Sequence, residues 1–300
     1  MIRNNLLSKE LLTSPVTRYV GFFAVIFWIA YLDSMFGGLL FDPASVYPFL
    51  IMMIVPVGFG LKNGRNVIRI ARRSCIPVGI IVCVVNIVLT LTNMESRTEL
   101  LLVTRLTYVP LALGIVLAFL LQIIEPTEEI DGDNKDSDFI LAFFCNLFAL
   151  SLAVYFLCEL SDQIISVVDF VSTQALSAAM LISCICIIHP KMLHLNFVGK
   201  IYKSSLGIML FFAIYGVSSY AYGSAITDPD IIVFAVALST LGILYGALLS
   251  LIAIVAGGYL RESDQESMLF DWHMIESYAF YVLVILPPLS FLEYGDTVMN

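Results

Sequence analysis

The sequence has little charge. Asp, Glu, Lys and Arg together make up 13% of its 300 residues, whereas a soluble domain carries roughly 25%. A freely soluble domain is therefore excluded. In place of charge, 60% of the residues are hydrophobic, and they form long continuous runs instead of amphipathic stripes. Such runs are typical of transmembrane helices, so the sequence predicts an all-α, polytopic helical membrane protein.

The sequence also lacks the motifs of common enzyme chemistry. No serine stands in a nucleophile elbow, and no glycine-rich loop has phosphate-binding spacing. The three histidines and six cysteines do not stand at metal-ligand spacing. We therefore expect that the protein is not an enzyme, and that it has no cofactor, no metal site and no nucleic-acid partner.

Long apolar runs define the expected spans. The first 18 residues lack the apolar core and cleavage site of a signal peptide, so we expect them to be retained. A ninth apolar run, 277–292, is short and has Pro287 and Pro288 near its end, so it crosses the membrane, lies at its interface or packs on the bundle. The eight expected transmembrane helices are 19–41, 46–61, 76–94, 100–123, 139–160, 164–188, 205–224 and 231–258.

Lys and Arg are distributed unevenly between the two sides of this topology. With the N-terminus in the cytoplasm, 13 of the 15 cations lie in cytoplasmic loops or termini, as the positive-inside rule requires. The largest group follows the second span and serves as a topological anchor: Lys62, Arg65, Arg69, Arg72 and Arg73. We expect a multi-pass protein of the bacterial inner membrane with a cytoplasmic N-terminus.

An acidic segment divides the chain. Residues 125–138 contain seven acids and one Lys, which is typical of a solvated cytoplasmic linker. Residues 1–124 and 139–260 then hold four spans each, and residues 261–300 form a C-terminal segment with the short ninth run.

The two halves are related in sequence pattern. Their fourth spans, Leu101–Phe119 and Ala237–Val255, align without gaps, so that Thr104 pairs with Thr240. Two four-helix units of the same orientation form a parallel repeat, and we expect the halves to superpose.

Three segments share the layout of a known family. GGLLFDPASVYPFLIMMIVPVGFGLKNGRNVIRIARR (Gly37–Arg73) has a glycine-rich turn, a proline-containing step and an apolar helix with a basic exit. SLGIMLFFAIYGVSSYAYGSAITDPD (Ser205–Asp230) and ALSTLGILYGALLSLIAIVAGGYLR (Ala237–Arg261) have the length and layout of its third and fourth helices. These segments resemble the MotA/TolQ/ExbB family, the pore-forming subunits of ion-driven motor units. The resemblance implies a duplicated relative with little cytoplasmic mass.

The resemblance also implies partners and a site. It implies conduction of protons or Na⁺, a homo-oligomer in membrane lipid, and a single-pass partner that supplies an intramembrane carboxylate. Thr240 corresponds to the pore-lining threonine that would face that carboxylate. The alternative is that the Thr240 hydroxyl bonds a carbonyl one turn back in its own helix. Ser239 and Thr104 are further candidates for the ion path or the partner contact.

The last predicted span carries small residues at steps of three or four. On one helix face these steps allow close approach of a neighbouring helix. We therefore interpret the following residues as a helix-packing seam: Ser239, Gly242, Gly246, Ser250, Ala253 and Gly257.

Arg105 lies about one turn inside its expected span, where a charge is costly. It either extends to the interface or pairs with an acid at the outer ends of the spans, such as Asp33. A place in the ion path is a third interpretation.

Three classes of function remain. The resemblance favours an ion-conducting subunit. The internal repeat is equally compatible with a transporter for a small solute or a lipid, with helices broken at Pro48, Pro56, Pro77 or Pro110. The third class is a membrane assembly or accessory protein that transports nothing.

Overall fold

The computed structural model describes residues 15–35, 43–62, 67–92, 109–124, 139–161, 170–188, 197–226 and 229–256. These residues are helical apart from a short entry at 170–172, and no strand occurs among them. The all-α prediction is therefore confirmed. The helices are α2 (Pro15–Met35), α3 (Pro43–Lys62), α4 (Val67–Thr92), α6 (Val109–Ile124), α7 (Phe139–Ser161), α8 (Thr173–Ile188), α9 (Phe197–Ile226) and α10 (Pro229–Ala256).

Four of the described helices are long and apolar enough to cross a membrane. The qualifying stretches are Val67–Leu89, Phe139–Glu159, Phe197–Gly216 and Ala237–Ala256. Shorter apolar stretches lie in α2, α3, α6 and α8. The chain thus has the character of a helical membrane protein, while the expectation of eight spans stays a prediction.

Two helices begin earlier than expected. α4 begins at Val67 and not at residue 76, and α9 begins at Phe197 and not at residue 205. Arg69, Arg72 and Arg73 therefore lie in the first two turns of α4 and not in a loop. Arg is a good helix former, so the helix continues through these cations. The Nε atoms of Arg72 and Arg73 and the Nη1 atom of Arg73 are buried.

Three of the four prolines do not break their helices in the way that a transporter with discontinuous helices requires. α3 continues through Pro48 and Pro56, and α4 continues through Pro77. Pro110 is the second residue of α6, a position in the first turn where its missing N–H costs little. The expectation of helix breaks is therefore wrong for Pro48, Pro56 and Pro77. For Pro110 it stays a prediction, because the structure describes the chain there only from Val109 onward.

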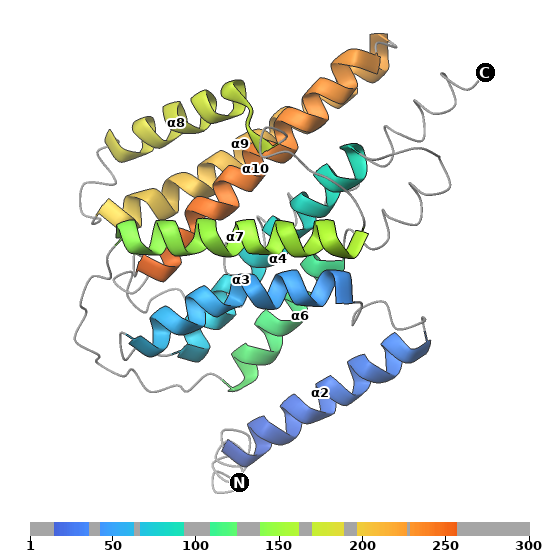
Figure 1. Cartoon of the computed structure of the whole chain (residues 1–300), viewed down its shortest axis with the longest axis vertical. Helices are drawn as coiled ribbons and strands as arrows, with labels where there is room; N and C mark the ends of the chain where they lie inside the picture. Colours follow the sequence, from blue (N-terminus) through green and yellow to red (C-terminus); the bar gives the residue numbers. More distant parts are fainter. Residues whose placement is uncertain are drawn as a thin grey trace, which may run out of the picture.

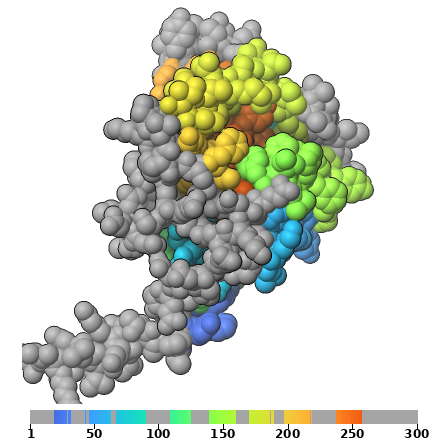
Figure 2. Space-filling view, turned by 90° about the vertical axis from the view of Figure 1, so that its left-hand side faces the viewer, coloured from blue at the N-terminus to red at the C-terminus, as the bar shows by residue number. Residues whose placement is uncertain are grey.

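α4 and α10 form the centre of the bundle (Figure 1). Inside the protein, 83% of the apolar stretch of α4 and 78% of that of α10 is buried, against 28% for α7. α10 packs on α9, α4, α7, α8 and α3, and α4 packs on α6 and α3 as well. Figure 2 shows parts of α10 between α7, α8 and α9, which cover it.

Glycine sets the distance between α4 and α6. A Cβ at Gly79 would lie 2.8 Å from the carbonyl oxygen of Pro110, and a Cβ at Gly114 would lie 2.5 Å from that of Cys75. Both obstacles are backbone atoms, which cannot rotate away. These two helices therefore pack with their backbones in contact, as small residues allow in membranes.

The outer surface of the described bundle is apolar. Phe27 on α2 is 82% exposed and Phe148 on α7 is 72% exposed, and both have apolar neighbours on the same faces. Apolar areas of this size are unfavourable in water. A surrounding of lipid removes that cost, in agreement with the composition.

The two halves share one packing pattern. In the first half, α6 packs on α4, α3 and α2, and α3 packs on α4. In the second half, α10 packs in the same way on α9, α8 and α7, and α8 packs on α9. Between the halves the contacts are unequal. α10 packs on α3 and α4, whereas α6 has no interface of comparable extent with α8 or α9 in the described residues.

Candidate functional site

The small-residue face of α10 is covered by α9. Phe212 lies directly over Gly242, and Met209 lies over Gly246. A Cβ at Gly246 would also lie 3.0 Å from the carbonyl oxygen of Ser205. This stretch of the face therefore serves the packing of the protein on itself.

Ser239 and Thr240 lie inside the bundle as well. Their side chains are 1% and 7% exposed, and both have an interaction partner within the protein. A partner helix outside the described bundle would reach Thr240 only if α10 changed its packing. The hydroxyls of Ser239 and Thr240 therefore interact inside the bundle and do not lie on its outer surface.

Three other buried side chains have an oxygen without a hydrogen-bond partner in the described part of the chain. They are Ser74 on α4, Asn146 on α7 and Ser250 on α10, each 0% exposed. The Asn146 amide nitrogen donates to the Ala142 carbonyl at 2.8 Å, so its Oδ1 is the atom without a donor. We call these three residues the polar layer.

The polar layer lies at one level of the bundle. Ile70 of α4 packs in one cluster with Ile254 of α10, and Ala142 of α7 packs in another with Val255 and Ala256. These clusters place the starts of α4 and α7 beside the end of α10. The three polar residues each stand about one helical turn further into the bundle.

The composition of the polar layer limits its chemistry. Two hydroxyls and one amide oxygen are neutral ligands that bind water or a cation of the hard type. An oxygen buried without a donor costs about 1–3 kcal/mol, so each of the three is a place where a bound water or ion restores stability. None of them is a strong acid or base.

Carboxylates are found only near helix ends in the described residues. They are Asp33 in α2, Glu159 in α7 and Asp230 in α10. No group of metal-binding side chains occurs among the described residues. The bundle interior therefore offers neutral oxygens without a counter-charge of its own.

Tyr245 joins α10 to the beginning of α8. Its hydroxyl donates to the Phe170 carbonyl at 2.8 Å and accepts from the Ser172 backbone N–H at 3.0 Å. Ser172 also caps α8, because its Oγ accepts from the Ala175 N–H at 3.3 Å. α8 thus begins beside the middle of the apolar stretch Ala237–Ala256 of α10.

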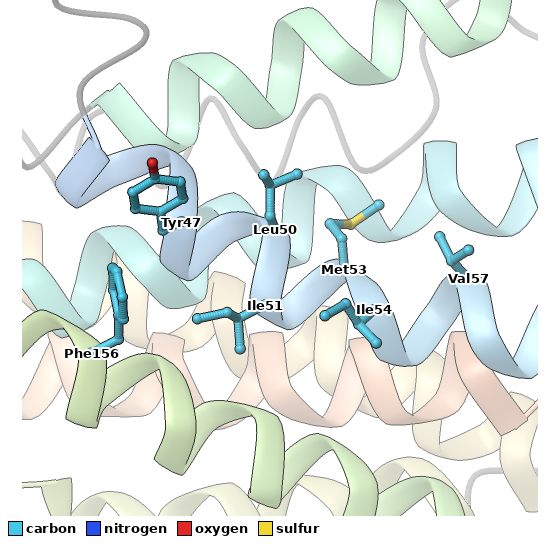
Figure 3. Close-up of a pocket in the computed structure, with 7 residues that line it drawn as sticks. All are labelled: Tyr47, Leu50, Ile51, Met53, Ile54, Val57 and Phe156. Atoms are coloured by element: carbon cyan, nitrogen blue, oxygen red, sulfur yellow. The ribbon is translucent and has the colours of Figure 1, made fainter.

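A groove runs along α3 on the outside of the bundle, and Phe156 of α7 lines it at one end (Figure 3). Its volume is about 590 Å³. At one end the rings of Tyr47 and Phe156 meet edge to face, with centroids 5.4 Å apart. The lining consists of Tyr47, Leu50, Ile51, Met53, Ile54, Val57 and Phe156. We call this surface the α3–α7 groove.

The remaining predicted site residues lie outside this description. Thr104, Arg105 and Gly257 are not among the described residues, and Asp33 lies in α2 without a described side chain. The same holds for the linker 125–138 and the C-terminal segment 261–300. Their proposed roles stay predictions.

Sequence reasoning missed Ser74 and the α3–α7 groove. Ser74 follows the basic group directly, so an expected span that starts at residue 76 assigns it to a loop. A predicted helix that began before Arg72 and Arg73 would have included Ser74 in the bundle. The groove depends on the packing of two helices far apart in sequence, which periodicity does not show.

No protein-family model, characterised protein or solved structure matches the chain significantly.

Proposed function

We propose that the protein is an integral membrane subunit that conducts protons or Na⁺ together with a single-pass partner. The observation that supports this best is the polar layer of Ser74, Asn146 and Ser250 in the core of the bundle. A cation that leaves water needs several oxygen ligands in place of its hydration shell. Three buried oxygens at a similar height on three helices are candidate ligands for such a shell.

The need for a partner follows from charge. Neutral oxygens alone compensate a desolvated cation poorly. The described interior contains no carboxylate, so the counter-charge comes from another helix. This agrees with the partner that the resemblance to the MotA/TolQ/ExbB family implies. The proposal includes assembly of several copies around that partner.

We further propose eight spans as two parallel four-helix repeats, in the bacterial inner membrane with a cytoplasmic N-terminus. The matching helix pairs in the two halves support the repeat. The distribution of Lys and Arg supports the orientation. The unequal contacts between the halves mean that the repeats do not share a two-fold interface in the described residues.

Affinity purification from native membranes tests the proposed assembly. We expect a single-span protein with an Asp or Glu inside its apolar segment to co-purify, and a native mass to show more than one copy of this chain. A chain that purifies alone and still conducts ions would contradict the proposed need for a partner. A chain that purifies alone and conducts nothing would contradict the whole proposal.

A second candidate function is transport of a lipid or a small apolar solute. The α3–α7 groove favours it, because the groove is apolar and opens to the outside of the bundle. Transport requires the groove to change its access between the two sides of the membrane. Flip of a fluorescent phospholipid in proteoliposomes separates this function from ion conduction.

A further inference from the structure

The α3–α7 groove has the length of one membrane leaflet. Tyr47 and Val57 are ten residues apart on α3, which is about 15 Å along a helix. This is half of the roughly 30 Å hydrocarbon core of a bilayer. Leu50 and Ile54 on its lining are 51% and 67% exposed, so the groove is open to lipid.

The groove continues along one ridge of α3 to a cation. Ile54, Gly58 and Lys62 follow one another at steps of four and so lie on one face of the helix. A Cβ at Gly58 would have no atom within 4 Å. The missing side chain of Gly58 therefore leaves the path from the groove to Lys62 open.

Lys62 is the last residue of α3, close to the contact between α3 and α7. Its Nζ lies 6.0 Å from the centre of the Phe59 ring. Phe59 packs in a cluster with Ala142 and Phe143 of α7. The ammonium group thus lies near the place where Phe59 meets α7, and Lys62 is exposed.

The cations of α3 and α4 gather at this end of the groove. Arg69, Arg72 and Arg73 lie in the first turns of α4, which packs on α3 and follows it closely in the chain. α3 and α4 contain no Asp or Glu. We propose that the α3–α7 groove binds the acyl chains of an anionic phospholipid whose phosphate lies at Lys62.

The groove is too small to enclose a second helix. A helix segment 15 Å long and 10 Å across occupies about 1,200 Å³, twice the 590 Å³ of the groove. Acyl chains are thinner and adapt to its irregular lining. This lipid site is independent of the proposed ion conduction.

Native mass spectrometry of the full chain with equimolar phosphatidylglycerol and phosphatidylethanolamine tests the site. Gly58→Leu fills the open path, and Gly21→Leu is its control because Gly21 on α2 also has no atom within 4 Å of its Cβ. Lys62→Gln removes the cation, and Lys200→Gln on α9 is its control. Melting in detergent shows that each variant is folded.

We expect the wild type to retain phosphatidylglycerol in preference to phosphatidylethanolamine, and Gly58→Leu to lose the bound lipid while Gly21→Leu keeps it. Lys62→Gln should lower the preference about fivefold, the effect of one cation near an anionic head group, and Lys200→Gln should leave it unchanged. Equal retention of the two lipids, or equal loss in Gly58→Leu and Gly21→Leu, would overturn the proposal. Loss of a bound protein and not of lipid in Gly58→Leu would overturn it in favour of a partner surface.

Discussion

The Tyr245 hydroxyl donates a 2.8 Å hydrogen bond to the Phe170 carbonyl, 75 residues away in the chain. The same oxygen accepts from the Ser172 N–H at 3.0 Å. α8 therefore begins at a fixed point beside the middle of α10. A helix start inside an apolar bundle leaves backbone groups without partners, and Tyr245 supplies one donor and one acceptor there.

Tyr245→Phe should lower the free energy of unfolding by about 1–3 kcal/mol, because two backbone groups lose their partner. Urea unfolding in detergent measures the change. Tyr19→Phe on the exposed face of α2 is the control and should be neutral. A Tyr245→Phe protein as stable as wild type would show that water or lipid satisfies the entry of α8 equally well.

Gly114→Ala should be strongly destabilising. The new Cβ would lie 2.5 Å from the Cys75 carbonyl oxygen, so α4 and α6 must separate, at a cost of about 1–3 kcal/mol or more. Thermal unfolding in detergent measures this cost. Gly21→Ala is the matched control, since nothing lies within 4 Å of its Cβ and Ala has the higher helix propensity. Equal melting temperatures for the two variants would contradict the close packing of α4 on α6.

The ends of the helices test the orientation. In a background without the six native cysteines, Lys62→Cys and Glu159→Cys place single thiols at the end of α3 and near the end of α7. An impermeant thiol reagent applied to intact cells should label Glu159→Cys, and Lys62→Cys should react only after the membrane is opened. Labelling of both in intact cells would refute the proposed topology.

The membrane class could be predicted from sequence because it depends on composition and run length alone. Helix limits were less accurate, since hydropathy ends at Ile76 while the helix continues back to Val67 through the arginines. The small-residue face was visible in the sequence, but the neighbours that fill it, Phe212 and Met209, come from another helix. The level shared by Ser74 and Ser250 likewise depends on packing between helices, which has no local signal.

Ser74→Ala tests whether the Ser74 hydroxyl lacks a hydrogen-bond partner within the protein. The substitution deletes a buried hydroxyl without a partner in the described residues, so the free energy of unfolding should stay equal or rise by about 1 kcal/mol. Ser205→Ala is the comparison, because the Ser205 hydroxyl donates to the Tyr202 carbonyl at 2.6 Å and its loss should destabilise. Chemical unfolding of both variants measures the difference. A Ser74→Ala variant that loses as much stability as Ser205→Ala would place Ser74 in a structural hydrogen bond.

The most direct test of ion conduction is flux of H⁺ and Na⁺ into proteoliposomes that contain the chain together with its co-purified partner. We predict a flux well above that of protein-free liposomes. The double variant Ser74→Ala, Ser250→Ala should fold and assemble but conduct about tenfold less, the effect of about 1.4 kcal/mol of lost ion stabilisation. Wild-type flux no greater than that of protein-free liposomes, or an equal flux through the double variant, would contradict the account.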